Sequence, residues 1–552
     1  MTTSLFSSSA TAATTTMPVP SDLLRTRKRS PNNSTHGPSP SSSSSSFPCK
    51  NKIKSSSSPK LTKKKAQQWG VDTSAMGFVK DDLSGWLCSL LVLVLIPVVM
   101  FGYWFSCEEH NCSILSAALS PLFGSEEGTM KSIADYIPRP TAKAWLMAIT
   151  WILFQAALFR FLPGRPTKGQ PTPTGNVLLY NINGIQALVV TLATFLIASF
   201  GLGLFPASII YHNYGPLLSV ASILGFGLSA VMLLKGTFFP TNSDVLRKGT
   251  VLYRFFQGTE LNPRIGNFDL KLFFIGRVGM MAWPVMNLSY LAAQYEMNLS
   301  QLLQQQEQAM SLDEVVAPAV NVHLESGELI FGVSNAMLLV FVLQMFYIVD
   351  FFVKEAWYLS TLDIMLDHFG FYLCYGSCVG IPFTYTLQCY YLASMSDPTK
   401  SASSLIINWE GWQALAILLL GLSSYVLFRL SNNQRLAFRA SGGRSKIWGR
   451  PPRFVRAPYR TASGECRENL LLASGYWGLA RHFNYLVDLV QSFTFGLCCG
   501  FHHIMPHSYT FIMLGLLLHR AARDERRCSL KYGEAWKEYC RLVPAVLIPK
   551  VY

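Results

Sequence analysis

Long apolar stretches separated by short polar segments run through most of the chain. Stretches of roughly 20 apolar residues are long enough to cross a bilayer. They lie at 84–106, 143–163, 184–210, 216–235, 273–293, 329–353, 372–393 and 411–430, and a final stretch at 486–519 has room for two short spans. Unbroken apolar runs lack the alternation of a membrane β-barrel, so only helices can satisfy the backbone in lipid. The pattern predicts an all-α polytopic membrane protein with eight to ten, most simply about ten, transmembrane helices and requires no strand.

The composition supports this class. The chain has 552 residues, of which 50% are hydrophobic and only 14% are charged, and the mean hydropathy is +0.27. These values exclude an ordinary soluble protein.

Residues 1–75 differ from the rest of the chain. They are rich in Ser, Thr and Pro and hold eleven Lys or Arg against two acidic residues, Asp22 and Asp72. Such a segment cannot form a packed core, and we expect a disordered tail followed by a membrane domain at 80–552. Three roles fit the tail: a solvated segment that keeps the N-terminus cytosolic, a transit peptide, or a tether to anionic lipid or nucleic acid. Aromatic residues are not interleaved with the basic clusters, so we expect no nucleic-acid partner.

Charges also indicate the topology. Basic residues crowd the segments 247–271, 429–467 and 520–550, whereas Glu108, Glu109, Glu126 and Glu127 make one segment acidic. The positive-inside rule predicts that the N-terminus and the basic loops are cytosolic and that the acidic segment is lumenal. There, Cys107 and Cys112 could form a disulfide. A fourth ligand beside Cys107, His110 and Cys112 is not evident, so we expect no metal site.

A dense polar signature follows the last apolar stretch. On a helix, Arg520, Asp524, Arg527 and Lys531 fall at i, i+4, i+7 and i+11 and form one charged stripe. The stripe could hold a phosphate-bearing cofactor. It could equally be the basic cap of a last transmembrane helix on the cytosolic side.

Further candidates for anion and cofactor binding precede this signature. Arg435 and Arg439 share one helical face, and guanidinium groups at that spacing suit a phosphate. Trp477 could stack on a flat ring, and Asn484 offers a donor and an acceptor to a carboxamide. The alternatives are that Trp477 and Tyr485 anchor the membrane interface and that the two arginines contact lipid headgroups.

Two long motifs resemble one known family, the membrane sterol reductases, which share a ten-helix fold and include the Δ14-sterol reductases and the lamin B receptor. The first contains His519-Arg520, Arg523-Asp524, Cys528 and Lys531-Tyr532-Gly533, and the second is Gly258-Thr259-Glu260-Leu261-Asn262-Pro263-Arg264. The stretches 180–187, 367–372 and 447–450 are most similar to the Δ7-reducing branch. In contrast, Val353-Lys354-Glu355 stands where the family usually has Trp-Asn-Glu. The resemblance covers residues 80–552.

The resemblance implies sterol-facing N-terminal helices and an NADPH pocket built from the C-terminal helices and loops of about 430–552. By position, the NADPH contacts fall on Arg435, Arg439, Leu472, Trp477, Asn484, Tyr485, Asp524, Cys528, Ser529, Leu530, Lys531, Tyr532 and Tyr539. These residues largely coincide with the cluster chosen on chemical grounds.

The chemistry of an alkene defines what the site must provide. Reduction by a nicotinamide requires that the double bond be protonated first, in a dry pocket with few nucleophiles. Ionisable groups in apolar spans indicate function. We therefore predict catalytic roles for Asp524, which would link cofactor and proton supply, and for Tyr347, which would face the sterol. Further candidates for the acid relay are Asp350, Glu355 and His368.

Together with these features, the resemblance implies NADPH-dependent reduction of the C7–C8 double bond of 5,7-diene sterols in the endoplasmic reticulum membrane. The partners would be the sterol substrate, membrane lipid and, as one possibility, a sterol isomerase. The alternatives are a Δ14-sterol reductase, a nuclear membrane scaffold similar to the lamin B receptor, or, more weakly, an isoprenylcysteine methyltransferase. The long loop at 441–470 favours the Δ7 branch over the Δ14 branch.

Overall fold

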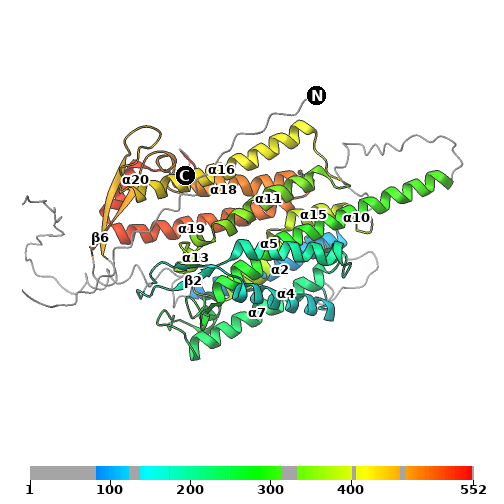
Figure 1. Cartoon of the computed structure of the whole chain (residues 1–552), viewed down its shortest axis with the longest axis horizontal. Coiled ribbons are helices and arrows are strands. Elements are labelled where there is room, and N and C mark those ends of the chain that lie inside the picture. The colour runs from blue at the N-terminus through cyan, green and yellow to red at the C-terminus, as the bar shows by residue number, and fades with distance from the viewer. Residues whose placement is uncertain are drawn as a thin grey trace, which may run out of the picture. The chain divides into compact units, whose positions relative to one another are not determined.

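The computed structural model describes residues 83–123, 137–172, 174–247, 249–311, 332–400, 406–460 and 466–549. The predicted basic tail, 1–75, lies outside these residues. The described chain is mainly helical, with three short antiparallel hairpins (Figure 1).

The first half of the described chain contains helices of very different lengths. In chain order its elements are α2 (Leu83–Glu109), α3 (Ile114–Phe123), α4 (Ala142–Phe161), β1 (Arg165–Lys168), β2 (Leu179–Ile182), α5 (Gly184–Leu196), the π-helix η2 (Ile197–Gly201), α6 (Ile209–His212), α7 (Tyr214–Phe238), α8 (Val251–Gln257), β3 (Arg264–Ile265), β4 (Phe268–Asp269), α9 (Leu270–Leu272), the π-helix η3 (Phe273–Met280) and α10 (Met281–Ser311).

The second half ends in the segments that carry the predicted cofactor residues. Its elements are α11 (Asn335–Val353), α12 (Glu355–Tyr358), α13 (Leu362–Met365), α14 (Phe371–Tyr375), the π-helix η4 (Gly376–Thr384), α15 (Leu387–Met395), α16 (Gly411–Ala440), β5 (Phe454–Arg460), β6 (Cys466–Leu472), α17 (Tyr476–Leu479), α18 (Phe483–Cys498), the 3₁₀ turn η5 (Met505–His507), α19 (Ser508–Tyr532) and α20 (Glu534–Leu542).

Six of the described helices are long and apolar enough to cross a membrane, fewer than the predicted eight to ten. They are Ser89–Glu109, Ala142–Phe161, Gly184–Gly201, Tyr214–Phe238, Asn335–Val353 and Gly411–Ala440. The other predicted spans are helical but interrupted or charged. The stretch 372–393 is divided among α14, η4 and α15, and 273–293 between η3 and α10. The last stretch contains the 16-residue α18 and the highly charged α19.

The hairpins differ from the strand-free prediction, and each lies outside the predicted spans. The pairs are β1 with β2, β3 with β4, and β5 with β6, all antiparallel. Outside the bilayer, water and turns satisfy strand edges that lipid could not. Only the hairpin β5–β6 contributes to the predicted cofactor region.

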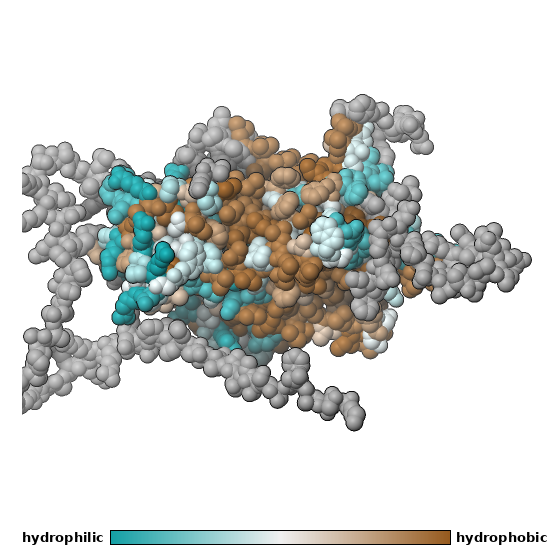
Figure 2. All heavy atoms as spheres, turned by 90° about the horizontal axis from the view of Figure 1, so that it is seen from above, coloured by the Kyte–Doolittle hydropathy of each residue, from teal (hydrophilic) through white to brown (hydrophobic). Residues whose placement is uncertain are grey.

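A bundle of long helices lies beside this region. In Figure 1, α11, α16, α18 and α19 run side by side, and the hairpin β5–β6 and α20 lie at one end of them. On the face in Figure 2, hydrophobic side chains cover the middle of the molecule, and hydrophilic side chains gather at its left end. An apolar belt next to a polar end is the arrangement that a bilayer requires.

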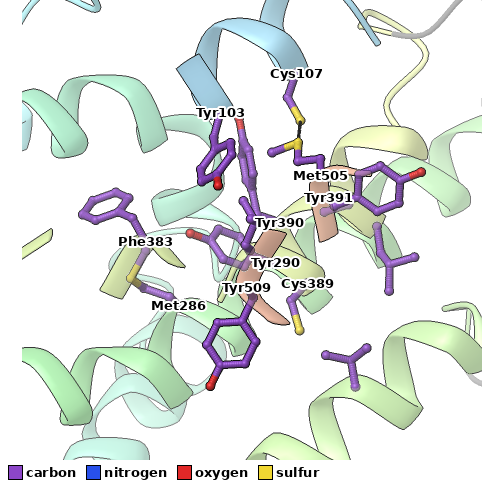
Figure 3. Packing of buried hydrophobic residues seen from close by; sticks show 14 of the residues in the cluster. Tyr103, Cys107, Met286, Tyr290, Phe383, Cys389, Tyr390, Tyr391, Met505 and Tyr509 are labelled. Atoms are coloured by element: carbon purple, nitrogen blue, oxygen red, sulfur yellow. Dashed lines mark hydrogen bonds between the residues drawn. The ribbon is translucent and has the colours of Figure 1, made fainter. Parts of the chain in front are cut away.

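The largest core cluster lies toward the opposite ends of α18 and α19. Figure 3 shows its closely packed aromatic and sulfur-containing side chains. The rings of Tyr214 and Tyr390 stack at 3.8 Å. Cys107 is joined to Cys112, which confirms the predicted disulfide. Because the disulfide leaves no thiol hydrogen on Cys107, its 3.4 Å approach to the sulfur of Met505 is a packing contact.

Two glycines allow the motif 258–264 to cross the loop 366–370. Gly258 begins the motif 258–264 and has a φ of +97°, which disfavours any residue with a side chain. A Cβ on Gly258 would lie 2.5 Å from the backbone nitrogen of Gly370. Beside this crossing, the backbone nitrogen of Phe369 donates to the carbonyl of Glu260. The motif 258–264 therefore packs directly on the loop 366–370.

Candidate functional site

Both family motifs hold the segment 362–370. From α19, the guanidinium of Arg520 pairs with Asp363, and that of Arg523 pairs with Asp367, both at 2.5 Å. Asp367 is buried, whereas Arg520 and Asp363 are partly exposed. A buried carboxylate is tolerated when a cation compensates its charge. These pairs attach the charged half of α19 to the helical bundle.

Lys271 of α9 also holds the segment 362–370. Its ammonium is fully buried and donates to the backbone carbonyls of Leu261, Ile364 and Asp367. Burial lowers the pKa of Lys271 to about 8, although the nearby carboxylates of Asp367 and Asp269 oppose this shift. Lys271 therefore joins the motif 258–264 to the segment 362–370, which the sequence did not predict.

The end of α16 and the short α17 build one wall of the predicted pocket. The indole nitrogen of Trp477 donates to the carbonyl of Ser431 at 2.8 Å, which fixes the ring. The guanidinium carbon of Arg435 lies 3.9 Å from the centroid of that ring. A stacked arginine keeps its charge and its hydrogen-bond donors while its flat face is covered. Trp477 thus positions Arg435 and is not available to stack on another ring from that side.

A group of cations meets at the end of α19. Lys531 lies within electrostatic range of Arg527, Arg439 and Asp524. Burial and, next, the like charge of Arg527 lower the pKa of Lys531 to about 8. Its ammonium also lies 3.8 Å from the centroid of the Tyr459 ring on β5.

Asp524 compensates only part of this charge. It lies 3.4 Å from Arg527, one helical turn along. With Arg435, the group contains four cations and this single carboxylate, so it carries an excess of positive charge. Guanidinium and ammonium groups in such excess bind phosphate. We call Arg435, Arg439, Asp524, Arg527 and Lys531 the cationic cluster.

Several predicted contact residues shape this region by packing. Cys528 and Tyr539 are buried between the hairpin, α19 and α20, whereas Leu472 is buried beside Phe438 of α16 and Trp477 of α17. Burial raises the pKa of the Cys528 thiol, so it remains neutral. Asn469 donates to the hydroxyl of Tyr532 at 2.7 Å, and burial raises the pKa of Tyr532 to about 12.

The remaining predicted contacts are either exposed or polar. Ser529 and Leu530 lie on the exposed face of α19. Asn484, near the start of α18, has a buried side-chain oxygen without a hydrogen-bond partner in the described part of the chain. Such an acceptor fits the NH₂ group of a bound amide. Tyr485, the next residue, lies within electrostatic range of Arg520, Asp524 and Arg435.

The predicted catalytic residues belong to two adjoining groups. Asp524 lies in the cationic cluster, whereas Tyr347 of α11 lies in the bundle, with its ring 5.6 Å from that of Trp283. Tyr485 and Arg520 connect the two groups. Tyr485 lies within electrostatic range of Asp524, and Arg520 lies within electrostatic range of Tyr347. No direct contact between Asp524 and Tyr347 occurs in the described ranges.

The other acidic candidates for the relay form ion pairs. Asp350 pairs with Arg429 and thereby joins α11 to α16. Glu355 pairs with the buried Arg277 at 2.7 Å and accepts a hydrogen bond from the backbone nitrogen of Gly184. Sequence reasoning missed Asp488 of α18, which lies within electrostatic range of Tyr347. Asp488 could have been found from the sequence, because it is a carboxylate within an apolar stretch.

Comparison with known proteins identifies the family of the chain. Residues 88–306 and 319–552 match the ergosterol biosynthesis ERG4/ERG24 family. A 7-dehydrocholesterol reductase of Xenopus laevis is 37% identical over 477 residues, covering 84% of this chain and 91% of the relative. One from Arabidopsis thaliana is 33% identical over 465 residues, covering 84% and 96%. A Delta(14)-sterol reductase of Methylotuvimicrobium alcaliphilum is 32% identical over 492 residues, covering 88% and 100%.

The matched residues include both motifs and all the predicted site residues. The resemblance to the membrane sterol reductases is thereby confirmed, as is the multi-pass helical character of the chain. The protein is a member of the ergosterol biosynthesis ERG4/ERG24 family.

Proposed function

We propose that the protein reduces the C7–C8 double bond of 5,7-diene sterols with NADPH as the hydride donor. The cationic cluster next to a helical bundle that contains Tyr347 and Asp488 is the observation that carries the proposal. The relatives named 7-dehydrocholesterol reductase, at 33–37% identity, support the Δ7 position.

NADPH fits the residues of the C-terminal region. Arg435, Arg439 and Lys531 would hold its phosphates, because they supply positive charge in excess of nearby carboxylate. The unpaired oxygen of Asn484 would accept from the carboxamide. When bound, NADPH supplies the hydride.

The chain's own residues would supply the proton. Addition of a proton at C8 uses the C7–C8 π electrons and leaves a cation at C7, which the 5,6 double bond delocalises. Hydride then adds at C7. Tyr347 is the proposed donor that faces the sterol, with Asp524 between the cofactor and the proton supply.

The charge distribution supports an endoplasmic reticulum location with the cationic end cytosolic. Helix α19 has 25 residues and so spans about 37 Å. The disulfide packs on Met505 just before α19, and the cationic cluster lies at the other end of this helix. A disulfide persists in an oxidising lumen, and basic residues favour the cytosolic side.

The purified chain in nanodiscs tests the proposal. With NADPH, it should convert 7-dehydrocholesterol to its 7,8-saturated product, and it should leave an 8,14-diene sterol largely unchanged. NADH should be a poor substitute, because it lacks the phosphate that the cationic cluster would bind. Reduction of the 8,14-diene alone would identify a Δ14-sterol reductase and contradict the proposal.

A further inference from the structure

Helix α18 carries a polar stripe. Asn484, Asp488 and Gln491 lie at i, i+4 and i+7 and therefore share one face of the helix. The side-chain oxygens of Asn484 and Gln491 are buried and have no hydrogen-bond partner in the part of the chain that the structure describes. The helix packs against α11, α16 and α19. Unpaired polar groups on one face of an enclosed helix point to a ligand that lies along it.

Asp488 lies in the middle of this stripe, among aromatic side chains. Its carboxylate is within electrostatic range of the phenol groups of Tyr347, Tyr385 and Tyr509. The rings of Tyr385 and Tyr509 are 5.1 Å apart, and Trp283 lies 5.1 Å from Tyr385 and 5.6 Å from Tyr347. Asp488 retains some accessible surface within this aromatic group. Its carboxylate therefore lies near the phenol group of Tyr347.

The nearest cations are already paired with other carboxylates. Asp488 is an electrostatic neighbour of Arg429 and Arg520. Arg429 pairs with Asp350, and Arg520 pairs with Asp363 at 2.5 Å. The described residues provide no contact ion pair to Asp488. A carboxylate without a contact partner is costly in an apolar bundle. A positively charged ligand bound beside Asp488 would offset this cost.

We propose that Asp488 supplies the negative charge that stabilises the cationic intermediate of sterol reduction. This inference rests on the proposed function. A proton bonds to C8 through the π pair of the C7–C8 double bond, and positive charge remains on C7, shared with C5. The bonds balance when C7 accepts a hydride: the sterol gains two electrons, and the nicotinamide donor loses two. Asp488 is neither donor nor acceptor in these steps.

The position of Asp488 distinguishes it from the other carboxylates. Asp524 lies in the cationic cluster beside Arg527, so its charge is compensated there. Asp350 and Asp363 form ion pairs. In an enclosed site, a fixed charge stabilises the opposite charge that develops during the reaction. A carboxylate that is already in place provides this stabilisation without reorganisation of the site.

A matched pair of inhibitors tests this role without turnover. The probes are a 7-azasterol, whose nitrogen is protonated and mimics the cation at C7, and the neutral 7-oxasterol of the same shape. Binding of each to the full-length protein in nanodiscs is measured for the wild type, Asp488→Asn and Asp488→Glu. The control is Asp397→Asn, a buried carboxylate that accepts from Tyr211 and lies outside the proposed site.

The wild type should bind the aza compound more tightly than the oxa compound. Asp488→Asn should reduce this preference by about tenfold or more, because one charge is removed from an enclosed site. Asp488→Glu and Asp397→Asn should retain it. The kcat of Asp488→Asn should fall while the affinity for the neutral sterol is nearly unchanged.

Two results would overturn the inference. One is equal binding of the two probes to the wild type, which needs no variant and therefore decides the matter even if Asp488→Asn does not fold. The other is an unchanged preference in a well-folded Asp488→Asn protein. If the wild type reduces 5,7-diene sterols in either case, the proposed function stands and only the role of Asp488 fails. Absence of any diene reduction would instead refute the proposed function.

Discussion

The ion pair between Arg523 and Asp367 should be a major source of stability for the C-terminal region. Their side chains are 11% and 1% exposed, and the nitrogen–oxygen distance is 2.5 Å. Substitution of Arg523 by Ala leaves the carboxylate of Asp367 buried without its main partner. The resulting loss of a buried pair costs about 3–5 kcal/mol. Lys271 is a second cation near Asp367, so we expect the lower end, about 3 kcal/mol.

The magnitude can be measured by unfolding the purified protein in mixed micelles with increasing SDS. The double variant Arg523→Ala/Asp367→Asn removes both charges of the pair and should regain most of the lost stability, since neither residue is then an unpaired buried charge and the buried Lys271 keeps the carboxylate of Asp269 nearby. Arg456→Ala is the control. Arg456 pairs with Glu468 at 3.1 Å, but the two side chains are 63% and 43% exposed, so the loss should be below about 1 kcal/mol.

Equal losses for Arg523→Ala and Arg456→Ala would refute this reasoning, because burial would then have no effect on the value of an ion pair. A double variant that is less stable than Arg523→Ala would also contradict it. In that case, side-chain packing rather than charge would account for the contribution of Arg523.

Three further predictions concern the cofactor region and the motif crossing. The KM for NADPH should rise as the pH increases through about 8, because Lys531 loses the proton that makes it a cation; Lys531→Arg should remove this dependence in steady-state assays. Arg439→Ala should raise the KM for NADPH about tenfold, the value of one charge-assisted hydrogen bond, whereas Arg541→Ala on the exposed surface of α20 should not. Gly370→Ala should destabilise the protein by about 2 kcal/mol or more in the SDS assay, since its Cβ would overlap the backbone of Gly258; Gly227→Ala, with open space around it, should be nearly neutral.

Much of the fold could be predicted because a bilayer imposes a simple rule on the sequence. Every long apolar stretch coincides with helices in the residues that the structure describes. The count of spans was less predictable. Apolar length does not reveal where η3 and η4 interrupt the helices, because π-helical turns depend on close tertiary contacts. Gly279, for example, approaches the backbone of Ser377 too closely for a side chain.

The candidate site was predictable where chemistry is local in the sequence. Arg435 and Arg439 are four residues apart, and the spacing of Cys107 and Cys112 was sufficient to predict a disulfide. The partners of Arg520 and Arg523 were not predictable, because Asp363 and Asp367 precede them by 157 and 156 residues. Such pairs form only after the helices pack.

Asp488 shows the other limit of sequence reasoning. A single carboxylate in an apolar stretch could have been an interhelical contact, as Asp350 proves to be. Only the packing of α18 against α11 and α19 places Asp488 near Tyr347 while its cationic neighbours are occupied.

Sterol profiling in yeast is the most direct test of the central claim. The host would be an ergosterol-producing strain that lacks its C22 desaturase, and it would express the wild type or Asp524→Ala. The wild type should deplete 5,7-diene sterols in favour of 7,8-saturated products, and the variant should not, because it lacks the carboxylate of the cationic cluster. Unchanged 5,7-dienes in cells that contain well-expressed wild-type protein would contradict the assignment of Δ7 reduction.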